Sequence, residues 1–408
     1  MFSHSSIMYK PFKTEMIPDV FWVGVNDWSI RVFHGYHTDE GSSYNAYLVM
    51  DEHPTLIDTV KYPFADEFLE RIQSVCDLDK IEFVVMNHAE GDHSSALPLV
   101  IPKMPNATIV TNAKCKEVLQ ILYPSLQSHT KWQIVDAKSK LSIGKRELSF
   151  VPVPMIHWPE SMFTYCAQDA TLFSNDGFGQ HLASIERWAD QLPLERVMHL
   201  LKEYNANILG HLPHLIKKAL ETVETISIKN ILTAHGVCWR GEQLKDVVGE
   251  YARFSELRYL QKVTIVFDSM YNSTQRAAIA IAEGVKSVGA KCEVLDLKSS
   301  DLTKVALHLY DSKCFAFGSP TLNATMMPTV EGAIGYCRGL KLLEKKQGAV
   351  FGAFGWAGMG VNHMNEALVK CGAVIEEPKG LQWKYQVNDE VLAKAFDLGV
   401  KLGKKAME

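Results

Sequence analysis

Short apolar runs alternate with amphipathic stretches through the N-terminal part of the chain. Runs such as 44–50 are rich in β-branched and aromatic residues, which predicts strands. The segment 63–75 carries its apolar residues at helical spacing and predicts a helix. This mixed alternation is typical of an αβ/βα sandwich. The predicted strands are 21–25, 44–50, 55–58, 81–87, 107–110, 132–136, 147–153, 171–174 and 231–234, and the predicted helices are 63–75, 94–101, 113–122, 192–204 and 213–225.

The pattern changes at Lys262. Short, fully apolar strands now alternate with loops and helices, as in a doubly wound parallel sheet. The predicted strands are 263–267, 314–317 and 349–354, and the predicted helices include 275–288 and 389–406.

A charged amphipathic segment at 242–260 lies between these two patterns and predicts a connecting helix. A chain of 408 residues is also long for one hydrophobic core. We therefore expect two domains, over residues 1–255 and 260–408.

Composition describes an ordinary soluble protein, with 47% hydrophobic residues, 22% charged residues and a net charge of −5. The mild acidity argues against nucleic acid as a partner. The chain has no apolar run long enough to span a membrane, and Met1 to Ser5 lack a targeting pattern, so we expect a cytoplasmic protein. Its eight cysteines form no C-x-x-C pair, which favours reduced thiols over a metal site built from sequence neighbours.

Candidate metal ligands cluster directly behind the predicted strand 81–87. His88, Glu90, Asp92 and His93 offer two imidazoles and two carboxylates in one loop, a set that can converge on two divalent metal ions. The alternative is a solvated polar turn, because loops are commonly rich in these residues.

The motif H-x-E-x-D-H resembles the metal loop of the metallo-β-lactamase-like fold, in which zinc hydrolases usually carry His at the middle position. The variant with Glu90 resembles the flavodiiron proteins, also called A-type flavoproteins. A hard anionic oxygen suits iron better than a neutral nitrogen does. The resemblance extends over nearly the whole chain, and it implies further ligands at His157, Asp176 and His235.

The resemblance also implies how two non-haem iron ions share the ligands. One iron would take His88, Glu90 and His157, the other would take Asp92, His93 and His235, and Asp176 would bridge them. His93 is the ligand that could instead turn away and leave a water in its place.

Other histidines carry weaker signals. His181, His211 and His214 lie near ligand-bearing segments, where a role beside the ligands and a bland surface or core role are both open. Histidines without a motif around them, His34 among them, are assigned structural roles.

Three loops of the second domain form a candidate FMN site. The loop after strand 263–267 is rich in hydroxyl and amide groups and precedes a helix, as in the phosphate loop of flavodoxins, although a simple polar N-cap is the alternative. The other two loops follow neighbouring strands, at the edge where doubly wound sheets bind ligands. Trp356 could stack on the flavin ring or cap the core. The expected FMN contacts are Ser269, Met270, Asn272, Ser273, Thr274, Pro320, Thr321, Leu322, Asn323, Gly355, Trp356 and Ala357.

A flavin beside a diiron site describes a terminal reductase. The resemblance implies reduction of O2 to water with four electrons, or of two NO to N2O with two, and leaves the preferred gas open. Two alternatives remain: a zinc hydrolase fused to a flavodoxin module, and a simple electron-transfer flavoprotein. We expect no rubredoxin domain, because the sequence has no C-x-x-C pair, and the expected donor is a separate rubredoxin, deazaflavin coenzyme or flavin reductase. The family resemblance further implies a head-to-tail homodimer or a homotetramer.

Overall fold

The computed structural model describes residues 13–377 and 379–408, so the expectation about Met1 to Ser5 lies outside the described residues. The chain divides into two compact units. The N-terminal unit comprises the chain up to Tyr204 together with His214–Ser255, and the C-terminal unit comprises Asn205–Pro213 and Glu256–Glu408. Each unit is described by itself.

The first sheet of the N-terminal unit has seven strands in the order β1-β2-β7-β8-β9-β10-β11. Its first strands pair antiparallel, and β8 to β11 pair parallel. The strands are β1 (Thr14–Ile17), β2 (Val20–Trp22), β7 (Tyr47–Val49), β8 (Thr55–Ile57), β9 (Phe83–Val85), β10 (Thr108–Thr111) and β11 (Trp132–Ile134).

The second sheet has six strands in sequence order, β12 to β17, and only β15 and β16 pair parallel. The strands are β12 (Lys140–Ser142), β13 (Glu147–Pro152), β14 (Met162–Cys166), β15 (Thr171–Asn175), β16 (Asn230–Thr233) and β17 (Trp239–Arg240). Two small ribbons are also present, formed by β3 (Val25–Asp27) with β6 (Ser42–Tyr44) and by β4 (Val32–Phe33) with β5 (Tyr36–His37).

One hydrophobic cluster joins the two sheets. Trp22 and Val85 of the first sheet pack with Phe150, Phe173 and Leu232 of the second, all buried. The expected αβ/βα sandwich is therefore confirmed, with its core between the sheets. The helices of this unit are α1 (Ala65–Gln73), α2 (Gly91–Ser94), α3 (Leu97–Val100), α4 (Ala113–Leu122), α5 (Leu194–Tyr204), α6 (Pro213–Val223) and α7 (Gln243–Ser255), with shorter 3-10 turns at Tyr62–Phe64, Leu78–Lys80, Ile101–Lys103, Pro124–Ser128 and Ala189–Gln191.

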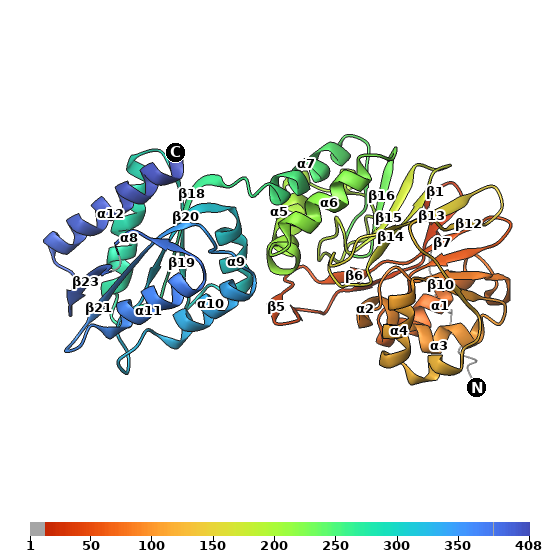
Figure 1. Ribbon diagram of the computed structural model, residues 1–408, viewed down its shortest axis with the longest axis horizontal. Coiled ribbons are helices and arrows are strands. Elements are labelled where there is room, and N and C mark those ends of the chain that lie inside the picture. Colours follow the sequence, from red (N-terminus) through yellow and green to blue (C-terminus); the bar gives the residue numbers. More distant parts are fainter. Residues whose placement is uncertain (1–12, 378) are drawn as a thin grey trace, which may run out of the picture. The chain divides into compact units, whose positions relative to one another are not determined.

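The C-terminal unit is built on a parallel sheet in the order β19-β18-β20-β21-β22, and β21 pairs with β23 beyond its pairing with β22 (Figure 1). This is the doubly wound arrangement that the sequence predicts. The strands are β18 (Leu260–Phe267), β19 (Lys291–Asp296), β20 (Ser312–Gly318), β21 (Gln347–Phe354), β22 (Val374–Ile375) and β23 (Leu381–Lys384), and the helices are α8 (Ser273–Ser287), α9 (Leu302–Asp311), α10 (Pro328–Gly339), α11 (Met359–Lys370) and α12 (Asp389–Met407).

Helices α8 and α12 approach each other unusually closely because each carries a glycine at the contact. A Cβ built on Gly284 would overlap the Phe396 carbonyl oxygen, and one built on Gly399 would overlap the Ile281 carbonyl oxygen. Only residues without a side chain permit this backbone separation.

Several predicted boundaries are wrong in informative ways. The predicted strand 44–50 is divided between β6 and β7, because Asn45 leaves the strand to donate its side chain to Thr233 and Gly236. The predicted connecting helix 242–260 ends at Ser255, and Leu260 already belongs to β18. The predicted helix 94–101 is replaced by α2 and α3, and α2 begins at Gly91, inside the candidate metal loop.

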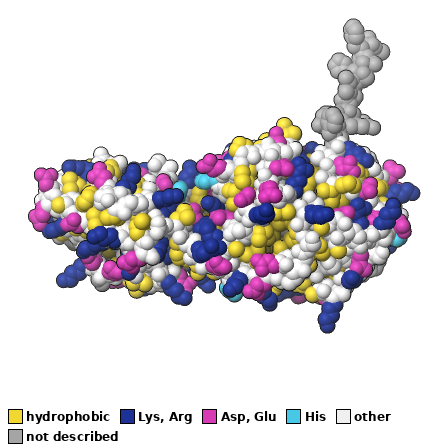
Figure 2. All heavy atoms as spheres, turned by 90° about the horizontal axis from the view of Figure 1, so that it is seen from above, with side chains coloured by type: hydrophobic (Ala, Val, Ile, Leu, Met, Phe, Trp, Pro, Cys, Tyr) yellow, Lys and Arg dark blue, Asp and Glu magenta, His cyan; other side chains and the backbone are white. Residues whose placement is uncertain are grey.

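Basic, acidic and apolar side chains are mixed over the face that Figure 2 displays. Among the described residues, we find no helix that combines the length and the apolar character needed to cross a bilayer.

Candidate diiron centre and flavin pocket

The loop after β9 is held in place by a buried carboxylate. Asp58 follows β8 and accepts hydrogen bonds from the Asn87 backbone N–H, at 2.7 Å, and from the Asn87 side-chain amide, at 2.9 Å. It also accepts one from the side chain of Asn175, at 3.3 Å. Asp58 thereby joins the loop after β9, in the first sheet, to the end of β15, in the second.

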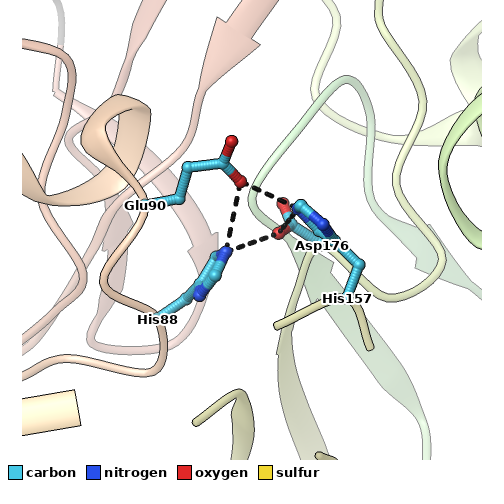
Figure 3. A group of neighbouring side chains, drawn as sticks. All are labelled: His88, Glu90, His157 and Asp176. Atoms are coloured by element: carbon cyan, nitrogen blue, oxygen red, sulfur yellow. Dashed lines mark hydrogen bonds and ion pairs between the residues drawn. The ribbon is translucent and has the colours of Figure 1, made fainter. Parts of the chain in front are cut away.

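A first group of possible ligands comprises His88, Glu90, His157 and Asp176 (Figure 3). The Glu90 Oε2 atom lies 2.8 Å from His157 Nε2 and 3.3 Å from His88 Nε2. The Asp176 Oδ2 atom lies 3.4 Å from each of the same two nitrogens. Two imidazoles and two carboxylates therefore face a common point.

A second group comprises Asp92, His93 and His235. The Asp92 Oδ2 atom lies 3.1 Å from His235 Nε2 and 3.3 Å from His93 Nε2. The second carboxylate oxygen of Asp176, Oδ1, lies 3.0 Å from His93 Nε2 and 3.3 Å from His235 Nε2. Asp176 thus presents one oxygen to each group, and the His93 ring is turned into the site rather than away from it.

Buried polar atoms without hydrogen-bond partners test whether metal ions fit here. Five buried atoms make no hydrogen bond among the described residues, although the Asp176 oxygens and His93 Nε2 have the close contacts given above; the five are Asp92 Oδ1, both Asp176 oxygens and both ring nitrogens of His93. Unpaired buried groups are costly, and a dense set of them requires an explanation such as an ion. A mixed set of imidazoles and carboxylates suits non-haem iron.

Carboxylates and imidazoles shift one another's pKa values within the site. Burial opposes the charged form of His157, but its contacts with Asp176 and Glu90 outweigh this and raise its pKa to about 9. Burial likewise opposes charging of His235, yet Asp176 and Asp92 raise its pKa to about 10. The same contacts outweigh burial at Glu90 and Asp176 and lower the pKa of each carboxyl group. Without a metal, His157 and His235 therefore hold protons that a metal ion would displace.

Two of the imidazoles are oriented by hydrogen bonds at Nδ1, the ring nitrogen that faces away from the candidate metal positions. The Nδ1 atom of His88 lies 2.8 Å from Glu160 Oε1, and the Nδ1 atom of His235 lies 2.7 Å from the backbone oxygen of Ser43. Donation from Nδ1 to these oxygens leaves Nε2 of both rings free to bind a metal ion.

His34 is a residue of the site that sequence reasoning missed. Its Nε2 atom lies 2.6 Å from Glu90 Oε1, while 63% of its side chain is exposed. It occupies the turn between β4 and β5, and no local pattern links that turn to the ligand loop. A cavity of about 480 Å³ opens here and is lined by Ile30, Val32, Phe33, His34, Lys61, Tyr62, Pro63, Glu90, Gly91, Asp92 and Ser95.

Of the three histidines whose role the sequence left open, one lies beside a candidate ligand and two do not. His181 is buried, its ring centroid lies 4.9 Å from that of His235, and its two nitrogens contact the hydroxyl groups of Tyr36 and Ser42. His214 is exposed on α6, and His211 belongs to the segment grouped with the C-terminal unit.

A second cavity, of about 580 Å³, lies at the carboxyl ends of β18, β20 and β21. All of the expected FMN contacts line it except Asn272, which caps α8 in the left-handed conformation, with φ of 61°. Sequence reasoning missed part of the lining because it did not identify β23, whose end supplies two of the residues. The missed residues are Tyr271, Ala324, Ala353, Phe354, Tyr385 and Gln386.

The hydroxyl groups of the phosphate-type loop differ in availability. Ser269 Oγ and Thr274 Oγ1 are buried without hydrogen-bond partners among the described residues. Ser273 Oγ is already engaged by Trp383, Tyr385 and Val387. One unpaired hydroxyl group in this loop and another in the first turn of α8 fit a bound phosphate group.

Trp356 does not cap the core. Its side chain is 94% exposed, and it stands at the rim of the cavity. A position at the rim leaves stacking on a ring, or shielding of it, as the roles open to this side chain.

Comparisons with known proteins agree with this architecture. The model of the ODP family beta lactamase matches residues 43–236, and the flavodoxin model matches residues 265–396. A flavodiiron protein from Giardia intestinalis is 52% identical, covers 98% of both chains and superposes with a TM-score of 0.96.

Two further relatives carry more specific names. The rubredoxin:oxygen oxidoreductase of Desulfovibrio gigas is 32% identical over 97% of this chain and 99% of its own, with a TM-score of 0.93. A nitric oxide reductase of Moorella thermoacetica is 34% identical over 94% of this chain and 96% of its own. The fold and site define a β-lactamase-like domain followed by a flavodoxin domain. The chain belongs to the flavodiiron protein family, a family of oxidoreductases.

Proposed function

We propose that this protein is a terminal reductase that converts O2 to water, NO to N2O, or both, at a non-haem diiron site supplied with electrons by FMN. The observation that carries the proposal is the position of Asp176, whose two oxygens each face one group of imidazoles. A shared carboxylate suits two metals held close enough to act on one small ligand. The named activities of the Desulfovibrio and Moorella relatives support both gases as candidates.

We assign the ligands as two sets that share one residue. His88, Glu90 and His157 would hold the first iron, and Asp92, His93 and His235 would hold the second. Asp176 would contribute one oxygen to each. Support comes from the two side-chain groups and from the orientation of His93 into the site.

The protein side chains supply position and charge. The bound irons would supply electrons and open coordination positions for a diatomic gas. Glu90, Asp92 and Asp176 together bring three carboxylates, which offset the charge of two cations and favour the more oxidised metal. The exposed His34 lines the 480 Å³ cavity together with Glu90 and Asp92, so this cavity gives a small molecule access to the site.

Electron supply requires the second domain. We assign residues 1–255 to the diiron domain and 260–408 to the FMN domain, with the flavin in the 580 Å³ cavity. The donor to FMN is a separate molecule, a rubredoxin, a deazaflavin coenzyme or a flavin reductase. We further propose a cytoplasmic protein that forms a head-to-tail homodimer or a homotetramer, in which the FMN of one subunit serves the irons of another.

The decisive experiment follows gas consumption directly. Protein that holds FMN and iron is reduced anaerobically, and O2 and NO consumption are then measured separately with electrodes at matched concentrations. Faster consumption of one gas identifies the main reaction, and similar rates identify an enzyme that uses both. Absence of consumption of either gas by fully loaded protein would refute the proposal.

Two alternative functions would give different results. A zinc hydrolase would hold zinc and cleave ester or thioester substrates, but Glu90 and two further carboxylates favour iron. A simple electron carrier would cycle its flavin with an empty first domain. Against it stand the complete ligand sets, with five buried polar atoms that make no hydrogen bond among the described residues.

A further inference from the structure

A buried carboxylate outside the ligand set connects two of the three loops that carry the first iron group. Glu160 lies in the loop between β13 and β14, three residues beyond His157, and only 3% of the residue is exposed. Its Oε1 atom accepts hydrogen bonds from His88 Nδ1, at 2.8 Å, and from the Ala89 backbone N–H, at 3.2 Å. One oxygen therefore holds both the ring of His88 and the backbone that follows it.

The backbone of Glu160 is itself fixed. Its carbonyl oxygen accepts a hydrogen bond of 2.6 Å from the side chain of Asn112, whose own side-chain oxygen caps α4 by accepting from the Cys115 N–H, at 2.9 Å. The neighbouring Trp158 packs edge-on against His88, with ring centroids 5.2 Å apart and an interplanar angle of 86°. The backbone that carries the Glu160 carboxylate is thus anchored to helix α4.

We infer that Glu160 is a positioning residue. It selects the tautomer of His88 that carries its proton on Nδ1, and it connects the loop of His157 to the loop of His88. A proton held at Nδ1 by the carboxylate leaves the Nε2 lone pair directed at the first iron. The negative charge behind the ring also makes that nitrogen a stronger ligand. This inference rests on the proposed diiron function and adds to it a residue that does not touch the metal.

The inference distinguishes the two iron positions. His235 of the second group is oriented by a neutral backbone oxygen, whereas His88 of the first group is oriented by a carboxylate. Loss of the Glu160 side chain should therefore lower iron affinity at the first position and leave iron affinity at the second position unchanged. Disruptions of this kind typically lower metal affinity about 10- to 100-fold.

The test uses the full-length protein and measures iron binding without turnover. Wild type, Glu160→Ala, Glu160→Gln and the exposed control Glu117→Ala are loaded with iron and challenged with a graded series of chelator concentrations. Mössbauer spectra follow each iron position. For Glu160→Ala we expect one of the two irons to leave at about 10- to 100-fold lower chelator concentration, with FMN content unchanged.

Glu160→Gln keeps the shape and one acceptor oxygen but removes the charge, so we expect an intermediate loss from the same position. If Glu160→Ala fails to fold, the comparison of Glu160→Gln with wild type still tests the inference. Equal chelator resistance of Glu160→Gln and wild type, or equal loss from both positions, would overturn the inference. Failure of the wild-type protein to bind two irons would instead refute the proposed diiron function, so the two failures are distinguishable.

Discussion

At the scale of single residues, the site depends on one shared carboxylate. Asp176 is 1% exposed, and each of its oxygens faces two imidazole nitrogens, at 3.0 to 3.4 Å. No other residue of the two ligand groups faces both. A change confined to this side chain therefore affects both metal positions.

Asp176→Asn keeps the size of the side chain and removes its negative charge. We expect both irons to be lost, with iron content below half of the wild-type value and gas consumption lowered about 100-fold or more. Iron is counted by atomic absorption and turnover by gas electrodes. The matched control is Asp190→Asn at the surface, which should keep both irons. Retention of two irons by Asp176→Asn would contradict the bridging assignment.

The raised histidine pKa values make the iron-free protein sensitive to pH. His157 and His235 are charged in the folded apo-protein up to about pH 9 and 10, whereas in the unfolded chain they are charged only below about pH 6.5. Their contribution to the free energy of unfolding is therefore fully present below pH 6.5 and is lost as the pH rises through 9 to 10.

Urea unfolding of chelator-treated protein should accordingly show a lower midpoint at pH 9.5 than at pH 6.5. The iron-loaded protein should lack this contribution, since bound metal holds the imidazoles neutral at both pH values. His157→Ala should reduce the difference in the apo-protein, and the exposed control His214→Ala should not. A midpoint difference that His157→Ala leaves unchanged would speak against this origin.

Most of the ligand set is predictable because its residue types and spacing are distinctive. His88, Glu90 and Asp92 form one motif in the chain, and the family resemblance supplies contexts for the ligands that follow. His34 is not predictable in this way, because a turn distant in sequence brings it to Glu90. The orientation of His93 depends on packing around its ring, which sequence spacing does not specify.

At the scale of secondary-structure elements, close helix packing in the C-terminal unit depends on Gly284 of α8 and Gly399 of α12. Sequence reasoning found both helices from their periodicity and could not find this contact. Periodicity shows which face is apolar, but not how closely two helices approach. β23 was missed for a different reason, because its four residues are too few to show a strand periodicity.

Gly284→Val should force α8 away from α12. Overpacking of this kind typically costs about 1–3 kcal/mol, so we expect a lower unfolding midpoint and weaker FMN retention in the C-terminal unit. The matched control is Gly332→Ala in α10, where a Cβ meets nothing within 4 Å. That change should stabilise the helix by roughly 0.5–1 kcal/mol. Equal midpoints for the two variants, measured by flavin fluorescence during urea unfolding, would argue against the packing explanation.

At the scale of the whole molecule, each unit has its own core and its own candidate cofactor site. Buried residues of α8 and α12 join the sheet of the C-terminal unit in one cluster, and the two sheets of the N-terminal unit share another. A protein with two cores need not unfold in one step. Ligands that bind one folded unit should stabilise only that unit.

Calorimetry should therefore resolve two transitions. Addition of FMN at 100 times its Kd to flavin-depleted protein should raise the free energy of unfolding of the C-terminal unit by about 2.7 kcal/mol, and thus its transition temperature. Iron loading should raise the transition temperature of the N-terminal unit. Flavin release and iron release, followed separately, identify which transition is which. A single transition that responds equally to both cofactors would show that the units unfold together.

The proposed ligands come from both layers of the sandwich. Glu90 and Asp92 follow β9 of the seven-stranded sheet, whereas Asp176 and His235 follow β15 and β16 of the six-stranded sheet. Two bound irons would cross-link the two sheets at the edge where these loops meet. Chains that never acquire metal would lack them, and local opening there would expose backbone to proteases. Quality control in the cell could then remove unmetallated copies without any dedicated sensor.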